Sequence, residues 1–144
     1  EAIRNLNGIQ LLLHLLAEVT GIGREDDQAR ENVDEAFLIA ILQALLNISN
    51  SHDVQSVFRT ADGIRPLLLL LIEYNNNGQE VSLHTLYILN NIAKDNENRQ
   101  DIVANKGLAI IGSILELNTY VDVLSQAVML LTTMSLNDDI AESV

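Results

Sequence analysis

The chain has 144 residues, enough for a single domain, and 48% of them are hydrophobic while only 3% are aromatic. Leu, Ile, Val and Ala must therefore fill the core, and because Pro66 is the one proline, the composition favours a largely helical protein. The net charge of −12 opposes binding to nucleic acid or to an anionic membrane surface.

The chain contains no cysteine, which excludes disulfides and thiolate metal sites. This is compatible with the cytoplasm, the location we expect, and with the nucleus. The longest apolar run covers residues 67–72 and is far shorter than the roughly 20 residues of a transmembrane helix. Because the chain starts without Met and stops within a helical pattern, we interpret it as part of a longer protein.

Three segments share one pattern around a glycine. In each, an apolar residue stands five positions before the glycine, and others stand one, four, seven and eight positions after it. The segments comprise Ile3, Gly8, Ile9, Leu12, Leu15 and Leu16; Phe58, Gly63, Ile64, Leu67, Leu70 and Leu71; and Ile102, Gly107, Leu108, Ile111, Ile114 and Leu115. Because a residue without Cβ can join two helices at a sharp angle, each segment predicts a short helix, a glycine corner and a second helix.

A longer third helix follows each corner. Its last residues read Leu-Leu-Asn-Ile-Ser at 45–49, Leu-Asn-Asn-Ile-Ala at 89–93 and Leu-Thr-Thr-Met-Ser at 131–135. These endings recur after 44 and then 42 residues. A period in the low forties with three helices is typical of stacked-helix solenoids.

In chain order, we expect repeats over approximately 1–50, 51–94 and 95–136, with the start of a fourth over 137–144. The expected helices cover 1–7, 9–19, 32–49, 52–62, 64–75, 79–94, 97–106, 108–117 and 120–136. The first repeat is longer than the others because of a charged segment with two glycines over 20–32. We predict that this segment is an exposed loop.

This pattern resembles the armadillo repeat family over nearly the whole chain. The resemblance rests on the apolar-x4-Gly-apolar corner and on the Leu-x-Asn-apolar-small ending of the third helix, where Asn47 and Asn91 match the family's asparagine and Thr133 departs from it. It implies an all-α protein, a right-handed superhelix of three-helix repeats forming one domain over 1–144. HEAT repeats are the main alternative, but they usually have two helices per unit and lack the corner glycine.

In the armadillo family the third helices line a concave groove, and their asparagine hydrogen-bonds the backbone of an extended peptide. The resemblance therefore implies a scaffold or adaptor that binds a partner protein as a peptide or a helix. A carboxamide both donates and accepts, so Asn47 and Asn91 suit this role, but they suit equally a role in bracing neighbouring loops. The candidate partner-binding residues are Gln43, Asn47, His84, Tyr87, Asn91, Gln126, Met129 and Thr133.

Nuclear import receptors of this family place a Trp four residues before the asparagine. The corresponding positions here hold Gln43, Tyr87 and Met129, so only Tyr87 with Asn91 approximates the pair. An importin-like cargo receptor and a small-GTPase regulator are the alternative functions. Uncapped repeat ends would also offer apolar surface for self-association.

Nothing in the sequence indicates a catalytic, cofactor or metal site, and we expect no enzyme activity. His14, His52 and His84 fall on different predicted helices, and no HExxH, glycine-rich phosphate loop or GxSxG motif occurs. The acidic runs at 25–27 and 138–139 lack the alternating ligands and mid-loop glycine of an EF-hand. The charged loop at 23–31 could contact a basic partner, or could simply be a solvated insertion.

Overall fold

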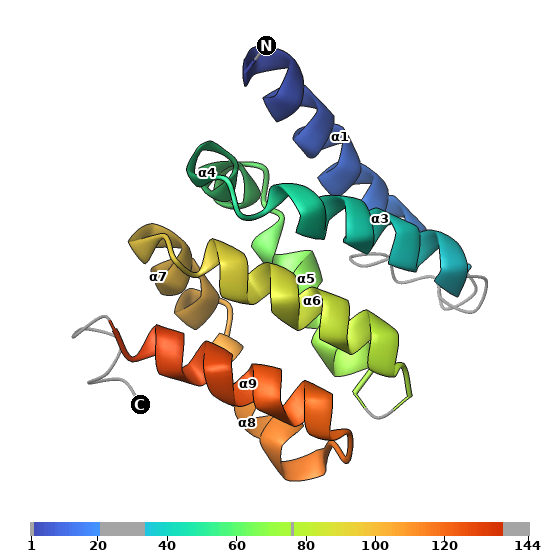
Figure 1. The fold of residues 1–144 in the computed structure, drawn as a ribbon, viewed down its shortest axis with the longest axis vertical. Coiled ribbons are helices and arrows are strands. Elements are labelled where there is room, and N and C mark those ends of the chain that lie inside the picture. The colour runs from blue at the N-terminus through green and yellow to red at the C-terminus, as the bar shows by residue number, and fades with distance from the viewer. Residues whose placement is uncertain (1, 21–33, 76, 137–144) are drawn as a thin grey trace.

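The computed structural model describes residues 2–20, 34–75 and 77–136, and every regular element in these ranges is an α-helix, which confirms the all-α prediction. The eight described helices (Figure 1) are α1 Ala2–Thr20, α3 Glu35–Ile48, α4 His52–Thr60, α5 Ile64–Glu73, α6 Gln79–Ile92, α7 Asn96–Ala104, α8 Gly107–Leu117 and α9 Val121–Met134. None of them has both the length and the apolar character needed to cross a membrane. Nearly all of the predicted loop at 20–32, and the predicted fourth repeat at 137–144, lie outside the described residues.

Three helices form one side of the molecule. α3, α6 and α9 lie next to one another and run in the same direction, with α5 and α8 behind them (Figure 1). α6 packs against α3 on one flank and against α9 on the other, and α4 and α7 pack together where α3 and α6 end. The predicted third helices of the repeats therefore share one layer.

Aliphatic side chains fill the space between the layers, as the composition predicted. Leu45 of α3, Leu67 of α5 and Leu89 of α6 have no exposed surface, and Phe58 is the largest of the fully buried side chains. Each buried leucine contributes roughly 1.5–3 kcal/mol relative to an exposed one. The apolar face of each helix therefore supplies most of the energy that holds the layers together.

Two of the three predicted glycine corners are present, at Gly63 and Gly107. The chain turns at the residue before each glycine, because Asp62 has a left-handed φ of 55° and Lys106 one of 66°. These φ values favour Gly, Asn or Asp over other residues. The turn at each corner is therefore made by the residue before the glycine.

The corner glycines themselves lie in crowded surroundings. A Cβ on Gly63 would lie 2.8 Å from the Leu13 side chain and 3.1 Å from the carbonyl oxygen of Phe58, five residues earlier. A Cβ on Gly107 would lie 2.7 Å from the carbonyl oxygen of Ile102, which stands in the equivalent position. The apolar-x4-Gly spacing thus marks where the chain folds back onto its own preceding helix.

The corner predicted at Gly8, between helices over 1–7 and 9–19, was wrong. α1 runs without interruption from Ala2 to Thr20, and a Cβ on Gly8 would meet nothing within 4 Å. At the other two corners, the short helix before the glycine is held in its own direction by packing, α4 against α1 and α7 against α4. No described helix precedes α1, and continuing the helix satisfies its backbone groups locally.

Hydrogen bonds connect residues that lie one predicted repeat apart. Asn91 Nδ2 donates to Ser49 Oγ over 2.8 Å, across a separation of 42 residues. Asn118 Nδ2 donates to Asn75 Oδ1 over 2.9 Å, across a separation of 43 residues. The period that the sequence predicted is therefore also the period of these contacts.

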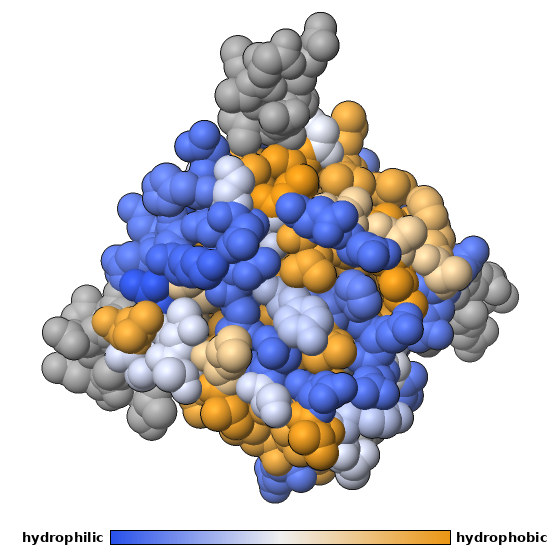
Figure 2. All heavy atoms as spheres, in the orientation of Figure 1, coloured by the Kyte–Doolittle hydropathy of each residue, from blue (hydrophilic) through white to orange (hydrophobic). Residues whose placement is uncertain are grey.

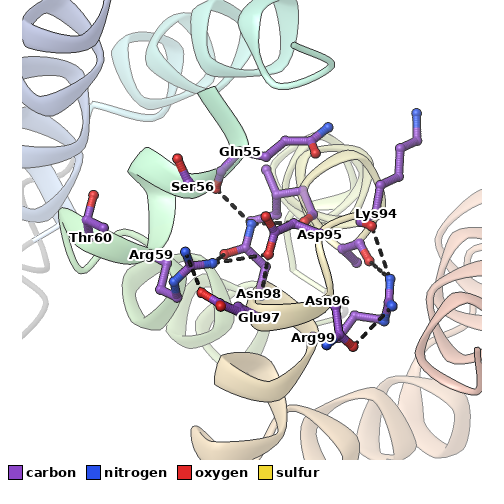
Figure 3. A network of polar contacts seen from close by, with 12 residues as sticks. Gln55, Ser56, Arg59, Thr60, Lys94, Asp95, Asn96, Glu97, Asn98 and Arg99 are labelled. Atoms are coloured by element: carbon purple, nitrogen blue, oxygen red, sulfur yellow. Dashed lines mark hydrogen bonds and ion pairs between the residues drawn. The ribbon is translucent and has the colours of Figure 1, made fainter. Parts of the chain in front are cut away.

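A polar network joins α4 to α7 (Figure 3). Arg59 Nη1 donates to Asn98 Oδ1 at 2.8 Å and pairs with Asp95 at 3.1 Å, while its Nη2 pairs with Glu97 at 2.9 Å. Asn98 is fully buried, and its Nδ2 donates to two backbone oxygens, one of them that of Gln55 at 2.7 Å. Because the amide of Asn98 is bonded on both sides, it can be buried and fix the spacing of α4 and α7.

Candidate partner-binding face

All eight residues predicted to bind a partner lie on α3, α6 and α9, the helices that form one layer. Each of the eight retains accessible surface. Gln43, Asn47 and Met129 are exposed, whereas His84, Tyr87, Asn91, Gln126 and Thr133 are half-buried. We call these eight residues the helix-three row.

The two asparagines of the helix-three row have different surroundings. The Asn47 side chain is exposed, and no hydrogen bond to it occurs in the described part of the chain. Asn91 is half-buried and donates to Ser49, so it braces the neighbouring helix, as the sequence left open. Thr133, in the third equivalent position, donates its hydroxyl to the carbonyl of Met129 at 3.1 Å within its own helix. Asn47 is therefore the asparagine that is available to a ligand without breaking an existing bond.

Asn47 also lines a hollow between α1, α3 and the start of α4. This hollow measures about 520 Å³ and has Ile9, Leu12 and Val54 among its apolar lining residues. An apolar surface beside a carboxamide suits a peptide, because the amide can satisfy the peptide backbone while a side chain enters the hollow.

The positions four residues before the asparagines hold Gln43, Tyr87 and Met129. Gln43 and Met129 are exposed, Met129 with 52% of its surface accessible, and Tyr87 is half-buried between them on α6. This part of the row is uncharged and offers an amide, a phenol and a thioether. It can contact apolar or aliphatic portions of a partner side chain.

His84 and Gln126 are both engaged by protein groups. His84 Nδ1 lies 2.8 Å from the carbonyl oxygen of Glu80, and because a carbonyl oxygen only accepts, Nδ1 is the donor. Gln126 accepts from Asn90 Nδ2 at 3.1 Å through its side-chain oxygen, and the same Nδ2 lies 3.2 Å from the Gln126 backbone oxygen. These two side chains contribute to contacts between and within the helices before any partner arrives.

Each helix of the layer also carries an exposed carboxylate in its first turn: Glu35 on α3, Glu80 on α6 and Asp122 on α9. Glu35 and Glu80 line a hollow of about 360 Å³ between their helices. Carboxylates in the first turn also interact favourably with the positive end of the helix dipole. Sequence reasoning missed Glu35, which completes a line of acidic residues across the layer.

Tyr74, which follows α5, lies close to the acidic end of this face. Its pKa is raised above 10.0, first because the phenol is partly buried and then because Glu35 and Glu73 disfavour a further negative charge nearby. The phenol therefore stays protonated throughout the physiological range. The smaller contribution, from Glu35 and Glu73, shows that the surroundings of Tyr74 are electronegative.

Apolar side chains are exposed at both ends of the layer. In Figure 2, hydrophilic residues gather over α4 and α7, whereas apolar residues gather over the end formed by α8 and α9. Val128 of α9 is 52% exposed, although Leu86, the equivalent residue of α6, is fully buried. At the other end, Phe37 of α3 is 45% exposed, although its equivalent Val81 is fully buried. In α6, which has a helix on both flanks, the equivalent positions are covered.

The histidines and acidic residues form no evident metal site. His14, His52 and His84 belong to α1, α4 and α6 respectively, and His14 lies 3.9 Å from Glu18 on its own helix. Within residues 2–20, 34–75 and 77–136 there is no group of three or more His, Cys, Asp or Glu side chains placed to hold a metal ion.

Comparisons with known proteins do not assign the chain to a family. Neither a scan of protein-family models nor searches of curated proteins and of solved structures found a match to the chain.

Proposed function

We propose that the chain is a protein-interaction module built from armadillo-type three-helix repeats, and that it binds an extended partner peptide across α3, α6 and α9. The observation that carries this proposal is the helix-three row. Side chains at equivalent positions of three parallel helices present amide, phenol and thioether groups on a common layer. In this proposal the chain is a scaffold or adaptor and performs no chemical step.

Three features support the repeat architecture on which the proposal rests. Contacts recur after 42 and 43 residues, as between Asn91 and Ser49. Gly63 and Gly107 stand in equivalent corners, each against the carbonyl oxygen of the residue five positions earlier. α3, α6 and α9 are parallel neighbours, as the third helices of stacked repeats would be.

The geometry suits a peptide in an extended conformation. Packed helices are about 8–10 Å apart and an extended chain advances about 3.3 Å per residue, so roughly three peptide residues would span one helix-to-helix step. An extended peptide has no internal backbone hydrogen bonds, so a carboxamide such as that of Asn47 can bond its amide group whatever the side chain. Binding of this kind would depend on backbone shape first and on peptide sequence second.

The line of carboxylates adds a preference for basic side chains. Glu35, Glu80 and Asp122 are exposed at the start of successive helices. A Lys or Arg side chain of the peptide could reach a carboxylate at one end of the layer while its backbone contacts the amides further along. This line favours, as a second candidate function, a receptor for Lys- or Arg-containing cargo peptides.

A peptide-binding measurement on the full chain tests the proposal. Fluorescence polarisation would compare extended peptides of about ten residues, longer than the roughly six residues that cover the two steps between three helices. The peptides would carry Lys and Arg, Asp and Glu, or uncharged residues. We expect the basic peptides to bind, and the double variant Gln43→Ala, Asn47→Ala to weaken binding about fivefold or more, since each lost hydrogen bond costs about 0.5–1.5 kcal/mol.

Gln100→Ala is the matched control, because Gln100 is exposed on α7 and is not part of the helix-three row. Both variants should keep the helical content and melting temperature of the parent, since neither Gln43 nor Asn47 is buried. Equal affinity of the double variant and Gln100→Ala would reject the face as the binding site.

A further inference from the structure

A second surface, on the side of α5 and α8, has features that the proposed function does not use. A hollow of about 540 Å³ lies between α5 and the corner that joins α7 to α8. Its apolar part includes Leu69, Ile72 and Ile110, and Ile72 is 57% exposed. Its basic part is Arg65 and Lys106. No Asp or Glu lines it, although the chain contains 20 of them.

The same hollow occurs one repeat earlier with a different lining. A hollow of about 410 Å³ lies between α1 and the corner that joins α4 to α5. Position for position, Gln10, His14, Ala17 and Asp62 of this earlier hollow stand where the later one has Arg65, Leu69, Ile72 and Lys106. The shape is therefore a general result of the corner, and Arg65 lines both hollows. Of the two, only the α5–α8 hollow also has Lys106 and lacks an acidic residue.

The two cations of the α5–α8 hollow are available to a ligand. Arg65 and Lys106 are exposed, and in the described part of the chain neither side chain makes an ion pair or a hydrogen bond. The other Lys and Arg side chains described are engaged: Arg59 pairs with Asp95 and Glu97, Lys94 donates to Asn50, and Arg99 donates to backbone oxygens. In a chain of net charge −12, this hollow is a local basic site.

Lys106 is also an unfavourable residue for the backbone it occupies. Its φ of 66° lies in the left-handed region, where lysine is disfavoured and Gly, Asn or Asp are better tolerated. The equivalent corner uses Asp62, which suits that conformation. The fold therefore does not explain a lysine at position 106, whereas contact with an anionic group would.

We propose that the α5–α8 hollow binds an acidic amphipathic segment of a partner protein. Apolar side chains of the segment would cover Leu69 and Ile72, and its carboxylates would contact Arg65 and Lys106. Exposed ion pairs contribute little affinity, so burial of the apolar surface would supply most of the binding energy and the two cations would select for acidic partners. This site lies apart from the helix-three row and does not depend on the proposed function.

Fluorescence anisotropy with the full chain and two labelled synthetic peptides tests this proposal. Both peptides would have Leu at i, i+3, i+4 and i+7 and a length of about 15 residues, near the minimum for helix formation in water; one would carry Glu at its flanking positions and the other Lys. We expect the Glu peptide to bind and the Lys peptide not to bind. Arg65→Gln should weaken binding about twofold to fivefold, the effect of one exposed ion pair.

The variant Lys106→Asn distinguishes a loss of binding from a loss of stability. Because asparagine tolerates a left-handed φ better than lysine, this variant should melt at the same temperature as the parent or higher, while its affinity for the Glu peptide falls. Lys94→Gln, which removes the same charge outside the hollow, should leave affinity unchanged.

Three results would overturn the proposal: equal binding of the Glu and Lys peptides, no binding of the Glu peptide at all, or equal affinity for the parent and Lys106→Asn. The same lining could hold a fatty acid instead of an acidic peptide, and titration with sodium laurate distinguishes these two occupants. If laurate bound in a manner that depended on Lys106 and the Glu peptide did not, the occupant would be lipid-like and the peptide assignment would be wrong.

Discussion

Asn91 on α6 donates a 2.8 Å hydrogen bond to the hydroxyl of Ser49, the C-cap residue that follows α3. Ser49 is fully buried, and its hydroxyl hydrogen is already donated to the carbonyl of Leu46 at 2.8 Å. The hydroxyl oxygen is therefore left as the acceptor that Asn91 uses. This bond makes Asn91 part of the contact between two helices of the layer, whatever it does for a partner.

Replacing Asn91 with Ala should therefore reduce stability. We expect the free energy of unfolding in urea to fall by about 1 kcal/mol, the usual net value of one hydrogen bond, with a similar loss for Ser49→Ala. Because both variants remove the same bond, the double variant should lose clearly less than the sum of the two. Fully additive losses would show that the two side chains do not interact.

The glycines offer a test in which one substitution has opposite effects at two sites. Gly8→Ala should stabilise the chain by about 0.5–1 kcal/mol, because position 8 is inside a continuous helix with open space around it. Gly107→Ala should destabilise it by about 1–3 kcal/mol, because the new Cβ would press on the carbonyl oxygen of Ile102. Thermal unfolding followed by circular dichroism measures both changes. A loss of stability in Gly8→Ala would mean that the corner exists in the first repeat after all.

Tyr74 should make the stability of the folded chain depend on pH in the alkaline range. The pKa of its phenol is raised in the folded state, by burial and then by Glu35 and Glu73. As the pH rises through 10, the phenol therefore loses its proton at a lower pH in the unfolded chain than in the folded chain. The stability is therefore complete below that pH and falls as the pH rises through the raised pKa. Urea unfolding between pH 9 and about 11 should show this fall, and Tyr74→Phe, which cannot ionise, should show less of it. The same slope in both proteins would contradict the effect.

Much of the fold follows from spacing along the chain. The all-α class and the approximate bounds of most helices could be predicted because apolar residues recur on one helical face. The corners at Gly63 and Gly107 could be predicted because a Cβ there would crowd the oxygens of Phe58 and Ile102. The error at Gly8 has a physical cause. A glycine permits a corner but does not create one, and the short helix before it must be held in its own direction by packing.

The site could be predicted only in part. Equivalent sequence positions placed all eight residues of the helix-three row on α3, α6 and α9, which pack side by side. The partner of Asn91 depends on how α3 and α6 are offset, which spacing does not specify. The basic hollow brings together Arg65 of α5 and Lys106, the residue before α8, which are far apart in the sequence, so it becomes visible only in three dimensions.

Chemical-shift mapping by NMR of the full chain, titrated with an extended Lys- and Arg-containing peptide, tests most directly whether α3, α6 and α9 form the binding face. The account predicts that the largest changes occur at Gln43, at Met129 and at the side-chain amide of Asn47, with smaller changes on α5 and α8. Changes confined to α5 and α8 or to α4 and α7, or none at saturating peptide, would contradict it.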